Sequence, residues 1–511
     1  MSPIMFPVLA RLFVLLSFLI YSSFSSKILV TFPHDFDSHI NSIKPFFLKL
    51  VERGHNVTVL DSSSNPKPRY FGPNVNVQQI YLPPKGEKFV RGDIFWTAET
   101  TSDQMPPLFA ASDKILGDMI QERKHELDAI MNTTWDLIIM DEVFGMHQNA
   151  ISYKLKRDKN VPYIVFSTTI TWMTNYINNA MGRYSSSRIG MFVPLPQDSR
   201  DFWNPSNFMH RISQFIADLR EYVGICYMLS VQGDLSNLKS IASDDFTFSK
   251  FTKQSAFHLN EQIDRLPFSV PEAADFKSIG AHCGTPKSLS SEYLDFMNDP
   301  GSKGTIYVGF GSTVDITYAP EFLWKSFEGA FRNLTDYRII FVNGGDRKMS
   351  VGRHVMMTKW APQLDILSHN TTKLFVSHAG LKSLKESVCT NTPIVYLPVF
   401  AEQSMNTRMT LEMGFARTVN KNTVTPAILL REIHEILDNY DVYHAKISKL
   451  HDLYLDRIMP ALDEGAFYAE RIMRGHGDRE EFKRKGIDLA WPEFMYLDLL
   501  SLIIIGFMLI K

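Results

Sequence analysis

Residues 360–406 read WAPQLDILSHNTTKLFVSHAGLKSLKESVCTNTPIVYLPVFAEQSMN. Within this stretch, Lys373 to Val376 is a short apolar run typical of a buried strand, and Leu381 to Cys389 has the pattern of a helix. His378-Ala379-Gly380 joins the two through a glycine turn. A strand that passes through such a turn into a helix directs free backbone N–H groups and a positive dipole end toward the turn. The stretch therefore predicts an α/β fold with an anion site beyond the carboxyl end of a strand.

The polar and aromatic side chains of this stretch indicate which anion binds. Trp360 offers a flat ring on which a base can stack, Gln363 can donate to and accept from a base or ribose, and Glu386 can accept from ribose hydroxyls. Glu402 and Gln403 lie beside a further helix start, where an acid and an amide can share the hydroxyls of a sugar. The order base, ribose, diphosphate and hexose predicts a nucleotide-sugar site.

The same stretch resembles the signature of the UDP-glycosyltransferases, the family that includes the membrane-bound UDP-glucuronosyltransferases of animals. That signature fixes about ten positions over roughly forty residues, which makes it far more specific than a lone glycine motif. The resemblance implies that the donor-binding residues are Gly311, Ser312, Trp360, Gln363, His378, Gly380, Lys382, Ser383, Glu386, Glu402 and Gln403.

Three positions depart from the family pattern. The family usually carries Asn where Lys382 stands, Asp where Glu402 stands and often Gly where Ala379 stands. Lys382 would bring a positive charge near the diphosphate. Glu402 places its carboxylate one methylene further out than Asp would.

Length, charge and cysteine content bound the possible functions. The chain has 511 residues, which suits two domains with additions at the ends. Its net charge is −2 without a basic block, which argues against nucleic acid as a partner. Cys226, Cys283 and Cys389 form no CxxC pair, so they predict neither a zinc site nor a disulfide framework. We expect them to be buried small side chains. A disulfide between one pair of them is the alternative.

Both ends of the chain carry targeting patterns. Residues 1–26 resemble a secretory signal, so the mature chain would begin near Lys27. After a juxtamembrane segment at 476–493, residues 494–510 are apolar apart from Asp498 and Ser501, near the lower length limit of a membrane-spanning helix. We expect a transmembrane anchor there; an amphipathic or buried terminal helix is the alternative. The four Asn-x-Ser/Thr triplets suit a lumenal body; they begin at Asn56, Asn132, Asn333 and Asn370.

The mature chain opens with the pattern of a doubly wound domain. Residues 27–32 predict a strand, Ile40, Ile43, Phe47 and Leu50 keep helical spacing, and residues 56–60 predict a second strand. Because Pro45 fits poorly inside a helix, we expect the regular helix to begin only around Ser42.

His39 lies just beyond the first predicted strand, and imidazole has a pKa suited to general-base chemistry near neutral pH. A further apolar strand is predicted at residues 135–140, and it ends at Asp141. The carboxylate of Asp141 could orient the imidazole. In the family, a histidine and an aspartate at these places are the base and its partner, which points to His39 and Asp141. From the residues alone, His34 and Glu142 stay open as rivals, and each of these side chains could equally be structural.

A second domain follows a linker rich in Gly, Pro and Ser at residues 284–303. Residues 305–310 predict a buried strand, closed by Gly311-Ser312. Strands at 338–342, 354–358, 373–376 and 393–397 alternate with helical runs and predict a second parallel sheet. Two facing Rossmann-like domains, 27–284 for the acceptor and 285–475 for the UDP-sugar, correspond to the GT-B architecture that the resemblance implies.

The resemblance implies an inverting, metal-independent transfer from a UDP-sugar to a hydroxyl of a lipophilic small molecule, with no cofactor besides this co-substrate. Glucuronic acid is the first choice of sugar, and glucose is the alternative. A non-catalytic UDP-sugar-binding membrane protein is a rival from another class. The resemblance further implies an endoplasmic reticulum membrane protein with a lumenal body and a role in detoxification, and it leaves a homo-oligomer open.

Overall fold

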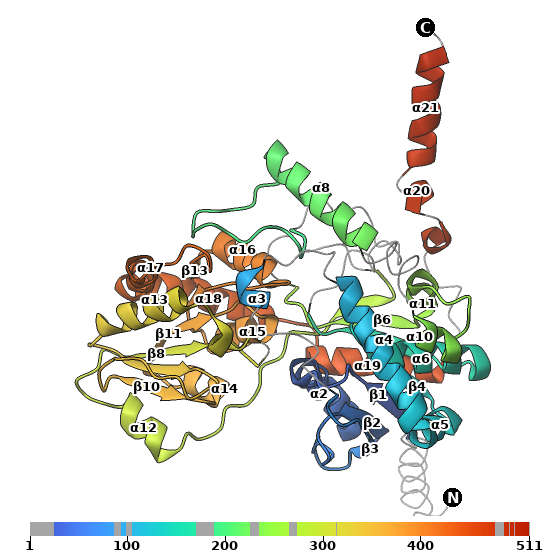
Figure 1. Ribbon diagram of the computed structural model, residues 1–511, viewed down its shortest axis with the longest axis horizontal. Coiled ribbons are helices and arrows are strands. Elements are labelled where there is room, and N and C mark those ends of the chain that lie inside the picture. The colour runs from blue at the N-terminus through green and yellow to red at the C-terminus, as the bar shows by residue number, and fades with distance from the viewer. Residues whose placement is uncertain are drawn as a thin grey trace, which may run out of the picture.

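The computed structural model describes residues 25–85, 94–98, 105–169, 189–224, 235–264, 273–312, 314–475, 485–489, 491–494 and 496–509. Two α/β domains make up the body, the first at the right of Figure 1 and the second at the left. Each domain is built on its own parallel sheet. The expected signal segment at 1–26 lies outside the described residues except for its last two.

Seven parallel strands form the first sheet, in the order β3-β2-β1-β4-β5-β6-β7. They are β1 (Lys27–Thr31), β2 (Asn56–Ser63), β3 (Asn76–Tyr81), β4 (Leu137–Asp141), β5 (Tyr163–Ser167), β6 (Phe257–Asn260) and β7 (Phe276–Ser278). The strand order reverses between β1 and β4, where Val30 pairs with Ile139. In doubly wound sheets, ligands bind at the carboxyl ends of the strands on either side of such a reversal.

The second sheet repeats this plan with six strands, in the order β10-β9-β8-β11-β12-β13. They are β8 (Thr305–Gly309), β9 (Arg338–Val342), β10 (Val355–Thr358), β11 (Thr372–Ser377), β12 (Ile394–Tyr396) and β13 (Ala416–Thr418). Here the order reverses between β8 and β11, where Val308 pairs with Val376. Every strand expected from the sequence is present, with bounds that differ by at most three residues; β2 continues three residues past its expected end at Leu60. The α/β fold with two parallel sheets is therefore confirmed.

Helices cover the two sheets. In the first domain they are α2 (Asp37–Glu52), α4 (Met105–Glu122), α5 (Lys124–Asn132), α6 (Met146–Lys159), α8 (Phe208–Tyr222), α10 (Ser236–Ile241) and α11 (Phe248–Gln254). Later in the chain come α12 (Ser291–Met297), α13 (Glu321–Arg332), α14 (Gln363–Leu367), α15 (Leu381–Cys389), α16 (Gln403–Met413), α17 (Pro426–Asp438), α18 (Tyr440–Leu455) and α19 (Ala461–Arg474). The domain bounds expected from the sequence, 285–475, place α19 in the second domain. In the structure, α19 packs on α2 and β4 of the first domain.

The expected start of the first helix near Ser42 is wrong. Helix α2 begins at Asp37 and continues through Pro45. Proline inside a helix costs about 3 kcal/mol, but this helix buries a face of large apolar side chains, each worth about 1.5–3 kcal/mol. Those side chains are Ile40, Ile43, Phe46, Phe47 and Leu50. Burial of this face outweighs the cost of the proline and keeps the first turn helical.

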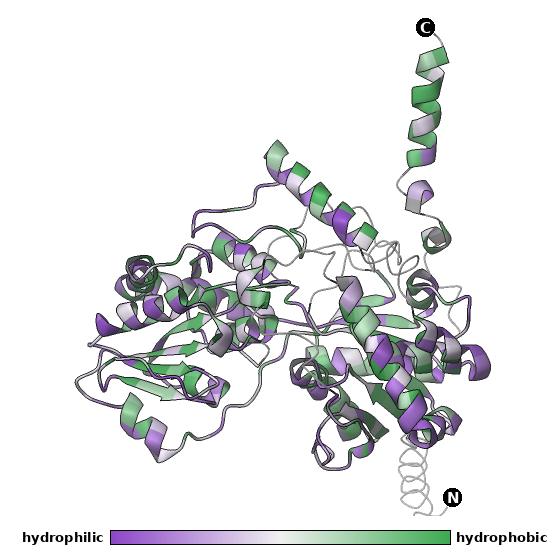
Figure 2. Ribbon diagram, viewed as in Figure 1, coloured by the Kyte–Doolittle hydropathy of each residue, from purple (hydrophilic) through white to green (hydrophobic). Residues whose placement is uncertain are grey.

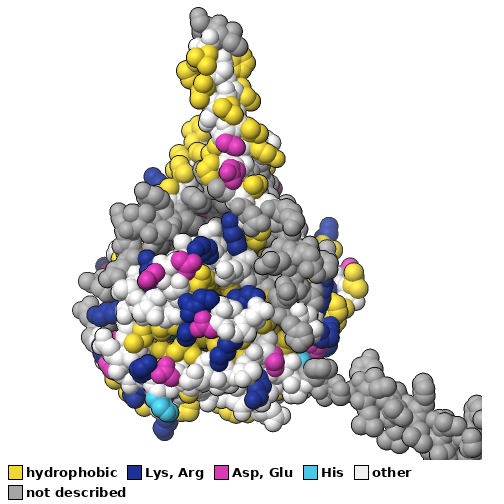
Figure 3. Space-filling view, turned by 90° about the vertical axis from the view of Figure 1, so that its right-hand side faces the viewer, with side chains coloured by type: hydrophobic (Ala, Val, Ile, Leu, Met, Phe, Trp, Pro, Cys, Tyr) yellow, Lys and Arg dark blue, Asp and Glu magenta, His cyan; other side chains and the backbone are white. Residues whose placement is uncertain are grey.

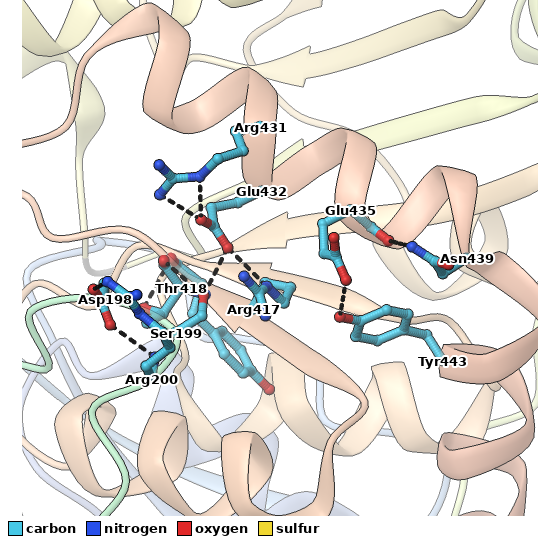
Figure 4. A network of polar contacts seen from close by, with 11 residues as sticks. Asp198, Ser199, Arg200, Arg417, Thr418, Arg431, Glu432, Glu435, Asn439 and Tyr443 are labelled. Carbon is cyan, nitrogen blue, oxygen red and sulfur yellow. Dashed lines mark hydrogen bonds and ion pairs between the residues drawn. The ribbon is translucent and has the colours of Figure 1, made fainter.

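Two segments of the first half of the chain dock on the second domain. Short helix α3 (Ile94–Thr97) buries Trp96 beside Phe310, and its Phe95 ring stacks on Phe400 with centroids 4.0 Å apart. Residues 194–201 form the other segment, in which Ser199 Oγ donates to Glu432 Oε2 at 2.8 Å and accepts from the backbone N–H of Thr418 (Figure 4). The two domains are thus joined by more than the linker.

Helix α21 (Leu497–Leu509) stands away from the body at the carboxyl end, and Figure 3 shows its hydrophobic side chains as a yellow column. Figure 2 shows the same helix as mostly hydrophobic, with a few pale or hydrophilic turns. Its side chains include Ile503, Ile504 and Phe507, all of which are exposed. In the described part of the chain, none of the helices combines the length and the hydropathy needed to cross a bilayer.

Candidate active site

The candidate catalytic residues lie at the reversal point of the first sheet. His39 is in the first turn of α2, directly after β1, and Asp141 is the last residue of β4. Because β1 and β4 are hydrogen-bonded neighbours, the two side chains meet: His39 Nδ1 is 2.9 Å from Asp141 Oδ2. Asp141 is fully buried, and its other oxygen accepts from the backbone N–H of Val143. The carboxylate is therefore fixed in place.

Thr168 completes the surroundings of the His39 ring. Its Oγ1 is 2.7 Å from His39 Nδ1, so Nδ1 faces two oxygen atoms. An Nδ1–H tautomer satisfies both, and it leaves Nε2 with a lone pair that can take a proton. Thr168 follows β5, the neighbour of β4, and it is a residue that the sequence pattern did not predict for this site. Only its place after a buried strand could have drawn attention to it.

Of the two rivals left open by the sequence, His34 has other side-chain partners. His34 Nδ1 is 2.7 Å from Ser62 Oγ, and its Nε2 lies 3.4 Å from Asp35. Burial lowers the pKa of His34. Glu142 follows Asp141, and its backbone N–H donates to the carbonyl of Phe166. The structure thus brings His39 together with Asp141 and directs His34 toward the end of β2.

His378 lies at the corresponding reversal point of the second sheet, directly after β11. Its ring is confined between two glycines: a Cβ at Gly311 would lie 2.8 Å from Cε1, and one at Gly380 would lie 2.5 Å from Nε2. Burial lowers the pKa of His378 to about 4, so the ring is neutral at neutral pH. Among the described residues, its buried Nδ1 has no hydrogen-bond partner. Gly311 and Ser312 are exposed just after β8.

Helix α15 begins immediately after this histidine, with Gly380 as its N-cap. The first backbone N–H groups of a helix have no partner within it, so they and the helix dipole can bind an anion. Ala379 takes the left-handed conformation, with φ of 68°, which costs a residue with a Cβ about 1–3 kcal/mol. Asn406 Nδ2 donates to the Ala379 carbonyl at 2.9 Å and stabilises this turn.

The expected base and ribose contacts gather beside α15. Gln363 Nε2 donates to Glu386 Oε2 at 2.5 Å and to Ser383 Oγ at 3.3 Å. Burial raises the pKa of Glu386, and the bond from Gln363 opposes that rise. Trp360 precedes α14 with 72% of its surface exposed, so a face of its ring is available for stacking.

Glu402 and Gln403 stand at the start of α16. Gln403 Oε1 accepts from the backbone N–H groups of Val399 and Phe400, at 2.8 and 3.0 Å. Its Nε2 is then the end that can donate to a sugar hydroxyl. Glu402 is buried, and burial raises its pKa, with the neighbouring His39 acting in the opposite direction. Glu402 of the second domain is therefore within electrostatic range of His39 in the first.

Lys382 takes an arrangement that the sequence did not predict. Its Nζ donates to the carbonyl of Ser38 and to Ser42 Oγ, both on α2 of the first domain. One turn further along α15, Lys385 Nζ forms a buried ion pair with Glu261 at 2.5 Å. Sequence reasoning missed Glu261 and Lys385 as interdomain residues, because nothing local to either position indicates its partner.

A cross-link holds α15 to the end of the first domain. Cys283 and Cys389 form a disulfide, the bridged pair that the sequence left open. Cys283 directly precedes the linker, and Cys389 is the last residue of α15. The helix that begins at the candidate anion site is therefore covalently tied at its other end.

Comparison with known proteins identifies the family. Residues 26–510 match the family model described as UDP-glucoronosyl and UDP-glucosyl transferase. The chain belongs to the UDP-glycosyltransferase family. UDP-glycosyltransferase UGT5 of Dactylopius coccus is 25% identical over 96% of this chain and 91% of its own length. Human UDP-glucuronosyltransferase 2B7 is 24% identical over 93% of this chain and 88% of its own length.

Solved structures of other UDP-glycosyltransferases share the fold. Phytolacca americana UGT2, complexed with UDP-2fluoro-glucose and pterostilbene, superposes with a TM-score of 0.57 at 15% identity. The match covers 89% of this chain and 100% of that structure. The two parallel-sheet domains are thus the GT-B architecture, as expected, and this UDP-glycosyltransferase is an enzyme of sugar transfer from a UDP-sugar to an acceptor.

Proposed function

We propose that this UDP-glycosyltransferase transfers glucuronic acid from UDP-glucuronate to a hydroxyl of a lipophilic small molecule, with inversion at the anomeric carbon. His39 is the general base and Asp141 orients it. The observation that carries this proposal is the 2.9 Å contact between His39 Nδ1 and Asp141 Oδ2, at the edge of the first sheet that α15 approaches through Lys382.

The proposed reaction is a single displacement. His39 Nε2 takes the proton of the acceptor hydroxyl, and its oxygen attacks the anomeric carbon while the bond from that carbon to UDP breaks. Asp141 stabilises the imidazolium that forms. The backbone N–H groups that begin α15 stabilise the departing diphosphate, as preorganised donors do where charge develops. Gln363, Glu386 and the exposed ring of Trp360 hold the nucleoside.

The choice of glucuronic acid is supported by animal relatives that carry glucuronosyltransferase in their names, such as human UDP-glucuronosyltransferase 2B7. Glucose is the alternative donor. Conjugation makes a lipophilic molecule more soluble in water, which suits a detoxifying role.

We also propose that the enzyme is held at a membrane with its body in the lumen of the endoplasmic reticulum. Helix α21 is apolar and exposed, but its 13 residues span only about 20 Å, less than the ~30 Å of a hydrocarbon core, so flanking residues would have to contribute. Helix α8, which lies on the same upper side of the body as α21 in Figure 1, has Phe208, Phe215 and Leu219 exposed. All four asparagines of the Asn-x-Ser/Thr triplets are exposed, as glycosylation requires.

Extraction of membranes that contain the full chain tests this attachment. An integral protein stays in the pellet after treatment with alkaline carbonate and enters the supernatant only with detergent. Release by carbonate alone would contradict an integral anchor.

A transfer assay tests the proposed reaction. Membranes with the expressed chain are offered UDP-glucuronate or UDP-glucose, with a panel of phenols and aliphatic alcohols, in the presence and absence of EDTA. We expect conjugate from UDP-glucuronate, unaffected by EDTA and absent with His39→Ala. If conjugate forms from UDP-glucose and not from UDP-glucuronate, the transferred sugar is glucose and the proposed sugar is wrong. Retained UDP binding without any conjugate would favour the non-catalytic rival.

A further inference from the structure

Lys382 crosses from the donor domain to the helix that carries the base. It is the second residue of α15, and its Nζ donates to the Ser38 carbonyl and to Ser42 Oγ of α2. Ser38 and Ser42 are one helical turn apart, so they lie on one face of α2. His39 is in the same turn. The ammonium group thus contacts the turn that presents the imidazole, from the opposite domain.

The contact continues through hydrogen bonds to the imidazole itself. Ser42 Oγ donates to the Thr168 carbonyl at 3.2 Å, and Thr168 Oγ1 is 2.7 Å from His39 Nδ1. His39 Nδ1 also contacts Asp141 Oδ2. A continuous path of polar contacts therefore joins the start of the donor helix to the base and its carboxylate.

The stability of α15 alone does not explain a lysine at this position. A cation in the first turn of a helix opposes the positive end of the helix dipole, which costs about 0.3–1 kcal/mol. Burial also lowers the pKa of Lys382, which the carboxylates of Glu261, Asp141 and Glu386 oppose. These costs are offset by partners in the other domain. Lys385, three residues later, likewise faces the first domain and pairs with Glu261.

We propose that Lys382 is a positioning residue that fixes the base-bearing turn of α2 relative to the donor helix α15. In this arrangement the lysine acts through Ser38 and Ser42 on His39, so it sets the distance between the base and the anomeric carbon rather than holding the diphosphate. This inference rests on the proposed role of His39. A displacement of about 1 Å in such an arrangement costs about a hundredfold in rate.

The test compares Lys382→Met, which removes the charge and keeps the length, with Lys382→Arg, which keeps the charge. Lys325→Met, on the exposed side of α13, is the matched control. We expect Lys382→Met to lower kcat at least tenfold while the Kd for UDP, measured by calorimetry, stays within twofold. Lys382→Arg should recover part of kcat, and Lys325→Met should match the wild type.

Each other outcome has a clear meaning. A tenfold weaker Kd for UDP with kcat retained would show that Lys382 holds the diphosphate and would overturn the inference. A lower melting temperature with unchanged kcat would overturn it in favour of a structural role. A wild type that transfers no sugar would contradict the proposed function itself. That result differs from a failure of the Lys382 inference, in which the wild type is active and Lys382→Met keeps its kcat.

A double-mutant cycle in kcat gives a second test, which can still be interpreted if Lys382→Met is partly unfolded. If Lys382 acts through the α2 turn, Ser42→Ala lowers kcat, and adding Lys382→Met to it lowers kcat further by less than the single change does. Fully additive losses in kcat would show that the two side chains act independently, which contradicts the inference.

Discussion

His39 is held at one ring nitrogen, and this arrangement determines what the residue can do. Asp141 and Thr168 both face Nδ1, so Nε2 is the nitrogen that can accept a proton. His378 is held differently, by contact with two glycines, and its burial keeps it neutral. His39 follows β1 and His378 follows β11, each beside the reversal of strand order in its own sheet. Of the two, only His39 has a carboxylate partner among the contacts described.

Replacing Asp141 by Asn tests the orienting role. The amide can present a donor to Nδ1 and favour the wrong tautomer, so Asp141→Asn should lower kcat by about 10²–10⁴, the range typical of general-base catalysis. The Kd for UDP should not change. Asp136→Asn is the matched control, because Asp136 accepts from the backbone N–H of Lys27 near the start of the same strand. Equal kcat for both variants would remove Asp141 from the mechanism.

A methyl group at Gly311 should disturb the donor site. Gly311 has φ of 70°, and its Cβ would lie 2.8 Å from His378 Cε1. Gly311→Ala should destabilise the fold by about 1–3 kcal/mol and weaken UDP binding at least tenfold, as measured by calorimetry. Gly506→Ala in α21 serves as control, since among the described residues no atom outside the helix's own backbone lies within 4 Å of its added Cβ. UDP binding as tight in Gly311→Ala as in the control would refute this prediction.

At the scale of elements, α15 is held at both ends. It begins at the candidate anion site after His378 and ends at Cys389, which is bonded to Cys283, the residue directly before the linker. Lys382 and Lys385 hold it to the first domain between these points. Helix α3 and residues 194–201 add contacts from the first half of the chain to the second domain.

Loss of the disulfide should be measurable as lost stability. The bond closes a loop across 106 residues, and cross-links of this kind contribute about 2–4 kcal/mol to the free energy of unfolding. The double variant Cys283→Ser, Cys389→Ser should unfold at lower urea concentration, and the wild type treated with reductant should show the same shift. If neither shows a shift, the two thiols are not bridged in the folded protein.

Local patterns in the sequence predicted most of the strands and several helices, because buried parallel strands are continuous apolar runs and turns carry glycine. The same logic placed His39 and Asp141 beyond two strands. Contacts between distant elements were not predictable: the reach of Lys382 to α2 and the return of α19 to the first domain depend on tertiary packing. The predicted start of α2 near Ser42 was wrong for the same reason, because burial of the apolar face of α2 outweighs the local cost of Pro45.

At the scale of the whole molecule, buried histidines make the fold sensitive to acid. Burial lowers the pKa of His147 to about 3 and that of His378 to about 4, against 6.5 for an unfolded chain. Between these values the unfolded chain binds more protons, so the free energy of unfolding falls as pH falls below about 6.5. Each such histidine contributes a slope of about 1.4 kcal/mol per pH unit. Glu386 and Glu402, whose pKa values are raised, act in the opposite direction.

Comparison with His147→Gln isolates one of these groups. His147 Nε2 lies 3.2 Å from the Phe32 carbonyl. Urea unfolding near pH 7 and pH 5 should show the wild type losing about 2 kcal/mol more than the variant over this interval. Equal losses in the two proteins would mean that His147 does not stay neutral in the fold.

The central claim is that His39, held by Asp141 in one domain, deprotonates an acceptor whose sugar donor is bound in the other. The most direct measurement is the ratio of wild-type to His39→Ala kcat/KM across a series of substituted phenols of increasing acidity. An acidic phenol is already ionised and needs little help from a base. The account predicts a large ratio for weakly acidic phenols that shrinks steadily as acidity rises. A ratio near one throughout, or one that does not depend on acidity, would contradict it.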